Sequence, residues 1–501
     1  MINTENAGSS VEVLLGEGYE DYLIGVKTGE TAPNITGIEK TGDYSCRVTA
    51  TEVNATLIYQ LGFEIAPLHY YGDAAAFNGT DNFGFTKGDL APIRAKTTNP
   101  MGAGAYKFVK FENSVINFEA NETYYKGAPK TKFIQFREMS DADKLNGVLT
   151  GTIDITDPSW SKDTAKAVSD ANGGEVTGPA ITTSTVENLG YGYIGINVQN
   201  VNVAGDPGSD ASKNLRKGLA TIFAVYRDVA IDSYYGDAAE VINYPISSTS
   251  WAAPKPTDDD YKVAFSVDVN GNDIYTSDMD ADAKYAAAKT AALGFFEAAG
   301  FTVTDGKLTA APAGAKLEYE VMVPGDGSGD HPAFMILTEA KAAFAELGLN
   351  LIINDLSNSS ELWEKLNAIQ GEIWCAAWGA ALDPDMTQIY FSDVANKNAA
   401  GKKRNPNGGP NQGGSNYEYC IADAELDQLI LEGLASNDQE YRKQIYKAAL
   451  DIVIDWACEI PTYQRKNAVV FSTERVNIST VTPDITTFYD WKAEIENIEL
   501  N

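Results

Sequence analysis

The chain has 501 residues, more than a single hydrophobic core usually organises, so two or more lobes are expected. It carries 70 Asp and Glu residues against 38 Lys and Arg residues, a net charge of −32 at pH 7. That charge opposes binding to nucleic-acid phosphates and to anionic membranes, because both attract cationic patches. No apolar run approaches the roughly 20 residues that cross a bilayer.

Residues 1–96 are expected to form mixed β structure with two helical turns. The run GIEKTGDYSCRVTATE alternates in polarity as a strand does, and its TGD marks a turn. Residues 55–69 are a mostly apolar run, ATLIYQLGFEIAPLH, that contains a proline and a histidine near its end. His69 is one of two histidines, and we expect a structural role for it because transition metals usually take three or four ligands.

The segment 99–155 predicts a regular run of elements after an Asn-Pro turn. Aromatic and β-branched residues in quick succession favour strands, and Gly151 ends the helix. The expected elements are strands over 105–111, 115–119 and 132–136, a helix over 141–149, and a strand that begins at Ile153.

The middle of the chain predicts helical and strand elements around a break. A strand over 189–197 precedes a long helix over 212–235, whose apolar residues recur at helical spacing. Arg216 and Arg227 are expected on its charged outer face. Residues 245–261 contain three prolines, and their apolar residues do not recur at helix or strand spacing. This is typical of a linker or hinge.

The second half alternates strands with helices, which predicts βαβ units and a largely parallel sheet. An alanine-rich helix over 281–299 is followed by strands over 317–325, 349–353 and 373–377, with helices over 332–347 and 360–369 between them. The basic, glycine-rich run 396–415 predicts a mobile surface loop, or a lid over a binding site. A last long helix is expected from a capping box, Asn437 with Glu440, to Pro461, before a strand over 468–471.

Four sequence patterns occur in a fixed order: NPMGAGAYKF, NETYYKGAPK, DADKLNGVLTGTIDI and GSNYEYC. Together they resemble the extracytoplasmic solute-binding proteins of ABC importers, family 5, which is the dipeptide-, oligopeptide- and nickel-binding class. The resemblance runs from about Gly37 to the C-terminus. It implies an α/β, two-lobe periplasmic-binding-protein-like fold (type II, the large cluster C type) with a hinge between the lobes.

The resemblance also divides the chain. Residues 1–96 would be the remnant of a β-rich subdomain of lobe I, 97–244 lobe I, 245–465 lobe II, and 466–501 the return to lobe I. The pattern that begins at Asn99 usually lies well inside these proteins, so we expect an N-terminally truncated chain without signal or lipid-attachment cysteine. The full-length protein is then expected outside the cytoplasm, either as a lipid-anchored lipoprotein of the cell surface or in the periplasm.

In the peptide-binding members, the strand edge that matches residues 372–392 pairs with the backbone of the bound peptide as an added strand. The aspartate that commonly holds the peptide's amino terminus is replaced by Ala381, so Asp383 or Asp385 substitutes for it or the contact is absent. The arginine that holds the carboxylate in some dipeptide-binding members falls at Phe334 or Met335. The ligand-binding candidates are Trp374, Ala377, Trp378, Gly379, Ala380, Ala381, Asp383, Asp385 and Tyr417, with Tyr390 and Tyr419 as further aromatic candidates that core packing would equally explain.

The sequence therefore favours a non-enzymatic binding protein that captures a peptide or related small solute in an inter-lobe cleft. Its partners would be that solute and the transmembrane subunits of an ABC importer; a monomer is expected, with no nucleic acid, cofactor or metal. One alternative is nickel-type binding of a metal or metal chelate, against which two scattered histidines argue. The other is a hydrolase with Asp383 and Asp385 as acid and base, although Asp-Pro-Asp is also ordinary turn chemistry.

Four cysteines occur without a CxxC or Cys/His cluster. They leave two alternatives open, a Cys375–Cys420 disulfide or buried free thiols.

Overall fold

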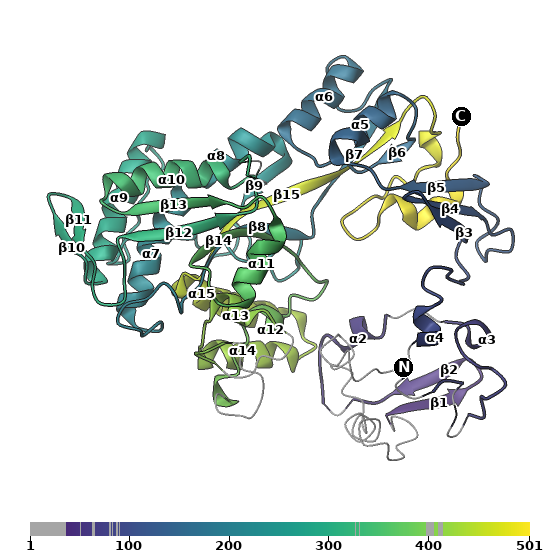
Figure 1. Cartoon of the computed structure of the whole chain (residues 1–501), viewed down its shortest axis with the longest axis horizontal. Coiled ribbons are helices and arrows are strands. Elements are labelled where there is room, and N and C mark those ends of the chain that lie inside the picture. The colour runs from purple at the N-terminus through teal and green to yellow at the C-terminus, as the bar shows by residue number, and fades with distance from the viewer. Residues whose placement is uncertain are drawn as a thin grey trace. The chain divides into compact units, whose positions relative to one another are not determined.

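The computed structural model describes residues 37–50, 52–62, 66–79, 82, 84–86, 89, 91–325, 327–329, 331–396, 405–408 and 414–501. The chain divides into two compact units. Unit 1 comprises Met1–Ser159, Lys166–Val186 and Ala468–Asn501, and unit 2 comprises Trp160–Ala165 and Glu187–Asn467. The helices and strands are labelled in Figure 1. No helix within the described ranges is long and apolar enough to span a bilayer.

This division differs from the boundaries expected from the sequence. Residues 187–244, expected in lobe I, belong to unit 2, because their strand and helix pack against the sheet and helices that follow. The proline-rich stretch 245–261, expected as a linker or hinge, also lies within unit 2, where Ala252 and Ala253 are buried. It therefore does not connect the two units.

Unit 1 contains an antiparallel sheet of three strands, β3 (Tyr106–Glu112), β4 (Val115–Ala120) and β5 (Phe133–Arg137). Successive side chains of a strand point to opposite faces, which places Phe108, Phe118 and Phe136 on one face of the sheet. The ring of Phe118 meets those of Phe108 and Phe136 edge-on, with centroids 6.1 and 5.9 Å away. Helix α5 (Asp141–Leu149) follows. The three strands and the helix predicted for this segment are confirmed.

The N-terminal part of unit 1 contains a hairpin of β1 (Ile38–Gly42) and β2 (Ser45–Val48), as the TGD turn predicts. Three short helices follow: α2 (Leu57–Gln60), α3 (Leu68–Tyr71), which carries His69, and α4 (Ala91–Arg94). Residues 1–36 of the predicted β region lie outside the described residues.

The remaining elements of unit 1 gather around the C-terminal end of strand β15 (Glu459–Ser472), which belongs to this unit from Ala468 onward. Strands β6 (Ile155–Thr156) and β7 (Ile181–Glu187) pair with it. Helix α6 (Lys162–Asn172), which belongs to this unit from Lys166 onward, and the 3₁₀ helices η5 (Ile478–Thr480) and η6 (Trp491–Asn497) complete the described elements there. Phe471, Val476, Val481 and Ile498 form a small core.

Unit 2 is built on a sheet with strand order β13-β12-β14-β8-β15 (Figure 1). Strands β12 (Glu318–Val323), β13 (Asn350–Asp355) and β14 (Ile373–Gly379) are parallel, and helices α10 (Phe334–Glu346) and α11 (Ser359–Asn367) connect them, so the predicted βαβ units are confirmed. Strand β8 (Gly190–Ile196) is antiparallel to β14 and to β15. The short strand β9 (Ala239–Val241) also pairs with β15, and β10 (Thr302–Thr304) forms a separate hairpin with β11 (Lys307–Ala310).

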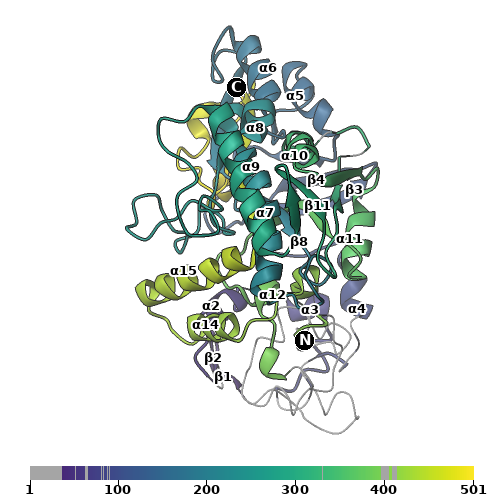
Figure 2. The ribbon, with the colours of Figure 1, turned by 90° about the vertical axis from the view of Figure 1, so that its left-hand side faces the viewer.

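The two faces of this sheet pack against different helices. Successive residues of β14 alternate between two cores: Ile373 and Cys375 belong to one, Trp374 and Ala376 to the other. The first core includes residues of α7 (Asp210–Val225), α9 (Ala281–Ala298) and α10; Figure 2 shows α7 and α9 side by side. The second includes residues of α14 (Ala424–Leu434) and α15 (Gln439–Trp456).

The helix predicted over 212–235 is wrong in two respects. It is interrupted at Tyr226, so that α7 is followed by α8 (Arg227–Ala230), the π-helix η2 (Ile231–Tyr235) and the 3₁₀ helix η3 (Gly236–Ala238). Arg216 and Arg227 are buried rather than on an outer face. Each guanidinium donates to backbone carbonyls of distant segments, which satisfies its donors inside the protein.

The predicted end of the last long helix is also wrong. Asp438, not Asn437, caps α15, since its side chain accepts from the N–H of Tyr441. The helix ends at Trp456 because Ala457 adopts a left-handed conformation (φ 49°), and Pro461 lies in β15. The chain therefore enters the sheet earlier than the sequence indicates.

Candidate functional site

The carboxyl-terminal half of β14 has a neighbour on one side only. The strand pairs with β8 along its whole length, from Ile373 to Gly379. On its other side the ladder with β12 includes only Ile373 and Trp374. Among the described residues, the segment from Ala377 to Gly379 is therefore an open sheet edge. We call this segment the β14 edge.

The register shows which backbone groups of the β14 edge are open. Ala380 donates its N–H to the carbonyl of Leu189 (3.0 Å), and Asn197 donates to the carbonyl of Glu372 (2.9 Å). In an antiparallel ladder, alternate residues use both their N–H and their C=O toward the same neighbour. Even-numbered residues of β14 therefore bond to β8, and Ala377 and Gly379 direct their backbone groups away from it.

Both residues lie at the surface. Ala377 and Gly379 are exposed, and a side-chain carbon added at Gly379 would meet no other atom within 4 Å. The candidate Ala380 is half-buried, and Ala381 is exposed. The edge thus offers two N–H and two C=O groups to an extended chain laid beside it.

Trp378 lies between these two residues in the sequence and is half-buried. Its ring stacks on Tyr193, with centroids 5.6 Å apart and planes within 8° of parallel. Its indole Nε1 donates to the hydroxyl of Tyr419 (3.2 Å), which in turn donates to Oε2 of Glu459 (2.5 Å). The indole is therefore held in one orientation beside the β14 edge.

Glu459, the first residue of β15, is the buried end of this hydrogen-bond chain. Tyr390, in helix α12 (Thr387–Tyr390), also donates its hydroxyl to Oε2 (2.8 Å), whereas Oε1 has no hydrogen-bond partner among the described residues. Burial raises the pKa of this carboxyl to about 7, and hydrogen bonds from the tyrosines oppose the shift. The sequence analysis did not single out Glu459, because nothing in its local pattern separates it from an exposed glutamate.

The other aromatic candidates are core residues. Trp374 is completely buried, meets Tyr193 edge-on (6.5 Å between centroids), and lies against Gly195, where a side-chain carbon would collide with the indole. Tyr390 and Tyr419 are buried, and Tyr417, in helix α13 (Asn416–Tyr419), is only 8% exposed. Of the predicted aromatic contacts, Trp378 alone is half-buried rather than buried.

Asp383 is engaged in a buried ion pair. Its Oδ1 lies 2.7 Å from a guanidinium nitrogen of Arg442, while Oδ2 is buried and has no hydrogen-bond partner in the described ranges. The same guanidinium donates to the carbonyl of Gly433 and to the hydroxyl of Tyr446, and it lies 5.2 Å from the ring centroid of Trp251. Asp383 is therefore part of a structural network rather than a free carboxylate.

Asp385 has a local structural role. Its Oδ1 accepts from the backbone N–H (2.8 Å) and the hydroxyl (2.5 Å) of Thr387, at the start of α12. Burial raises the pKa of this carboxyl, and the bonds from Thr387 oppose the shift. With Asp383 bound to Arg442, the two carboxylates are not arranged as a free acid and base.

The predicted mobile loop falls mostly outside the described residues. Residues 397–404 and 409–413 of the glycine-rich run are not described, and the part that precedes them contains the 3₁₀ helix η4 (Val394–Asn396).

Of the two alternatives for the cysteines, the structure contains free thiols. Cys375, Cys420 and Cys458 are buried free thiols and Cys46 is an exposed one, so the Cys375–Cys420 disulfide is not formed. Burial raises the pKa of the Cys420 thiol to about 12.

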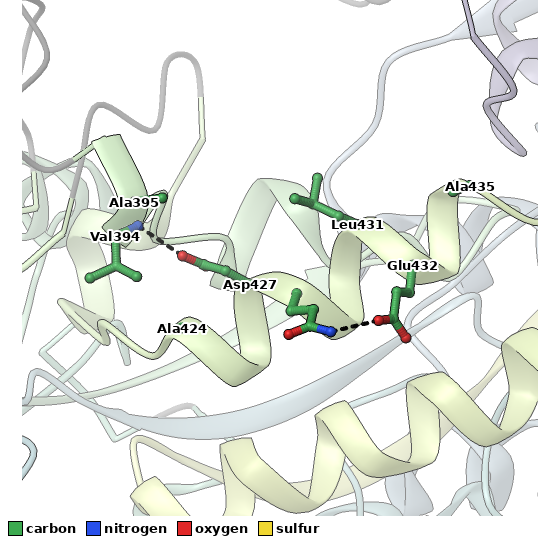
Figure 3. Close-up of a pocket in the computed structure, with 8 residues that line it drawn as sticks. Val394, Ala395, Ala424, Asp427, Leu431, Glu432 and Ala435 are labelled. Atoms are coloured by element: carbon green, nitrogen blue, oxygen red, sulfur yellow. Dashed lines mark hydrogen bonds between the residues drawn. The ribbon is translucent and has the colours of Figure 1, made fainter.

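A surface hollow of about 420 Å³ lies over α14 (Figure 3), and none of its lining residues belongs to the β14 edge. Its polar side chains are paired within it: Asp427 accepts from the N–H of Val394 (2.8 Å), and Gln428 donates to Glu432 (2.8 Å). The remaining lining is mostly alanine and aliphatic. In the described part of the chain, no group of three or more His, Cys, Asp or Glu residues could hold a metal ion.

The sequence matches the family model of bacterial extracellular solute-binding proteins, family 5 (middle), over residues 5–399. The chain belongs to this family of ABC-importer solute-binding proteins, whose members are extracytoplasmic transport components rather than enzymes. No curated protein sequence matches the chain.

Solved structures show the same fold at low sequence identity. The oligopeptide-binding protein AppA from Bacillus subtilis, in complex with a nonapeptide, is 18% identical, with a TM-score of 0.59 over 93% of this chain and 78% of that one. The substrate-binding protein CtaP from Listeria monocytogenes is 17% identical, with a TM-score of 0.63 over 98% and 84%. NikZ from Campylobacter jejuni, in complex with Ni(L-His), is 16% identical, with a TM-score of 0.60 over 96% and 84%. The predicted α/β, two-lobe fold of periplasmic binding proteins is confirmed.

Proposed function

We propose that this protein captures a peptide in extended conformation at the β14 edge and delivers it to the transmembrane subunits of an ABC importer. The observation that carries the proposal is the pair of residues, Ala377 and Gly379, whose backbone groups face away from β8 beside the fixed indole of Trp378. The ladder between β12 and β14 ends at Trp374. A peptide strand laid against the β14 edge would pair with β14 beyond that point. The protein would act as a monomer outside the cytoplasm, lipid-anchored or in the periplasm.

Backbone pairing explains how such a site would accept many sequences. Each of the four open groups contributes about 0.5–1.5 kcal/mol when it is hydrogen-bonded, whatever the side chains of the peptide. Together they give a few kcal/mol, less than the roughly 8 kcal/mol of a micromolar ligand. The remainder would come from apolar contact with Trp378 and with other side chains that bury the peptide.

The charged candidates contribute little to this site. Asp383 is bound to Arg442, Asp385 bonds to Thr387, and Ala381 carries no charge. Neither Phe334 nor Met335, at the start of α10, can pair with a carboxylate. The proposal is therefore recognition of the middle of a peptide rather than of its charged termini.

Ala377→Pro tests the proposal. Proline removes the N–H of residue 377, which β8 does not use, and edge strands tolerate proline. We expect the variant to remain folded but to lose most of the thermal stabilisation that a pool of synthetic pentapeptides gives the wild type. The matched control, Ala377→Ser, keeps the N–H and should be stabilised as the wild type is.

Two outcomes would contradict the proposal. One is undiminished peptide stabilisation of a folded Ala377→Pro variant. The other is stabilisation of the wild type by Ni(L-His), the ligand present in the NikZ structure, with no response to any peptide.

A further inference from the structure

Glu459 lies among aromatic side chains with no cation to balance it. It is completely buried, and none of the ion pairs formed by the described residues includes it. Its nearest titratable neighbours come from each element packed against it: Tyr191 and Tyr193 of β8, Tyr390 of α12, Glu418 and Tyr419 of α13, and Cys458 beside it in the chain. A negative charge in such a place is costly unless water or a cation reaches it.

The atoms of the carboxyl group differ in their surroundings. Oε2 accepts hydrogen bonds from Tyr390 and Tyr419, whereas Oε1 is buried and the described part of the chain gives it no hydrogen-bond partner. A proton on Oε1 makes the group neutral and leaves both tyrosine bonds intact. Ionisation would leave a buried charge with one oxygen unhydrated, and bringing water to that oxygen requires the aromatic cluster to loosen.

The same carboxyl is linked to the β14 edge by two hydrogen bonds. Trp378 donates to Tyr419, and Tyr419 donates to Glu459. A change in the packing around Glu459 therefore reaches the indole through Tyr419.

We propose that Glu459 is a positioning residue for ligand capture: its neutral form fixes Tyr419 and hence the indole of Trp378, and its ionisation weakens ligand binding. The inference rests on the proposed function, because it assumes that the ligand binds beside Trp378. Burial raises the pKa of Glu459 to about 7, so the change is centred near neutral pH.

The test uses the full chain and two readouts between pH 5.5 and 8.5. The first is the tryptophan fluorescence of the ligand-free protein. The fluorescence of the Trp378→Phe variant is subtracted from it, which leaves the signal of Trp378. The second is the affinity for one pentapeptide taken from the pool that stabilises the wild type. If only the neutral acid is competent, affinity falls about tenfold by one pH unit above the pKa of Glu459.

Three variants separate positioning from general stability. Glu459→Gln keeps a neutral, similarly shaped side chain, so it should bind as the wild type does at low pH and lose the pH dependence in both readouts. Tyr419→Phe removes the link and should abolish the fluorescence transition of Trp378. Glu418→Gln removes a second buried carboxyl that does not bond to Tyr419, and it should retain the transition.

The outcomes are distinguishable from failure of the proposed function. A wild type with no fluorescence transition, or a Glu459→Gln variant with the wild-type pH profile, overturns the inference even if peptides bind. If no peptide stabilises the wild type at any pH, the proposed function fails, while the ligand-free transition still decides whether Glu459 controls Trp378.

Discussion

Two tryptophans of one strand have different roles that their spacing does not reveal. Trp374 and Trp378 are an even number of residues apart, so both face the same side of the sheet. Trp374 is covered by Tyr193 and lies against Gly195, whereas Trp378 emerges where β12 no longer pairs with β14. The sequence identifies both as candidates but does not show where β12 ends its pairing.

The two tryptophans therefore predict opposite effects. Trp378→Ala should abolish peptide-induced stabilisation while the free energy of unfolding changes by about 1 kcal/mol, because the side chain is only half-buried. Trp374→Ala should lower the free energy of unfolding by about 3–5 kcal/mol through the cavity it leaves. Denaturant unfolding and thermal shift with peptide measure both effects, and full peptide stabilisation of Trp378→Ala would mean that the site is misplaced.

At the level of elements, local pattern predicts most of what is observed. The strands β3, β4 and β5 and the helix α5 follow from aromatic and β-branched runs and a glycine stop, all local signals. The interruption at Tyr226 does not follow from a local signal, and the contacts of the residue after it are not local either. Arg227 donates to Ile242 and Pro461, which are brought near only by the folded sheet.

Arg227→Met is expected to destabilise unit 2 severely. The substitution leaves the buried carbonyls of Ala224, Ile242 and Pro461 without the guanidinium donors that satisfy them. Each unsatisfied group costs roughly 1–3 kcal/mol, so the free energy of unfolding should fall by about 3–5 kcal/mol.

The control for this change is Arg137→Met, whose exposed side chain bonds only to Gln135 among the described residues. Urea unfolding of that variant should differ from wild type by no more than about 0.5 kcal/mol. Equal effects of the two substitutions would contradict a special role for the buried arginine.

For the whole molecule, Glu459 links stability to pH. Its pKa of about 7 in the folded protein lies above the ordinary value of 4.5 that applies to the unfolded chain. Between these values the folded protein holds a proton that the unfolded chain has lost, so this group's contribution to the free energy of unfolding is present below pH 4.5 and is lost as pH rises to 7. The shift corresponds to about 3 kcal/mol.

Comparison of the wild type with Glu459→Gln isolates this contribution from that of the many other carboxylates. The difference in the free energy of unfolding between the two proteins should change by about 3 kcal/mol between pH 4.5 and 8, with the wild type losing relative stability as pH rises. Urea unfolding across this range measures it. A difference independent of pH would show that Glu459 titrates normally in the folded protein.

The open backbone groups of the β14 edge provide the most direct test of the central claim. Amide hydrogen exchange at Ala377 and Gly379 should be fast in the free protein and at least about tenfold slower with a saturating pentapeptide, because those N–H groups then bond to the ligand. The amides of Ala376 and Trp378, which face β8, should be protected in both states. If a peptide stabilises the protein while exchange at Ala377 and Gly379 is unchanged, the ligand does not bind at the β14 edge.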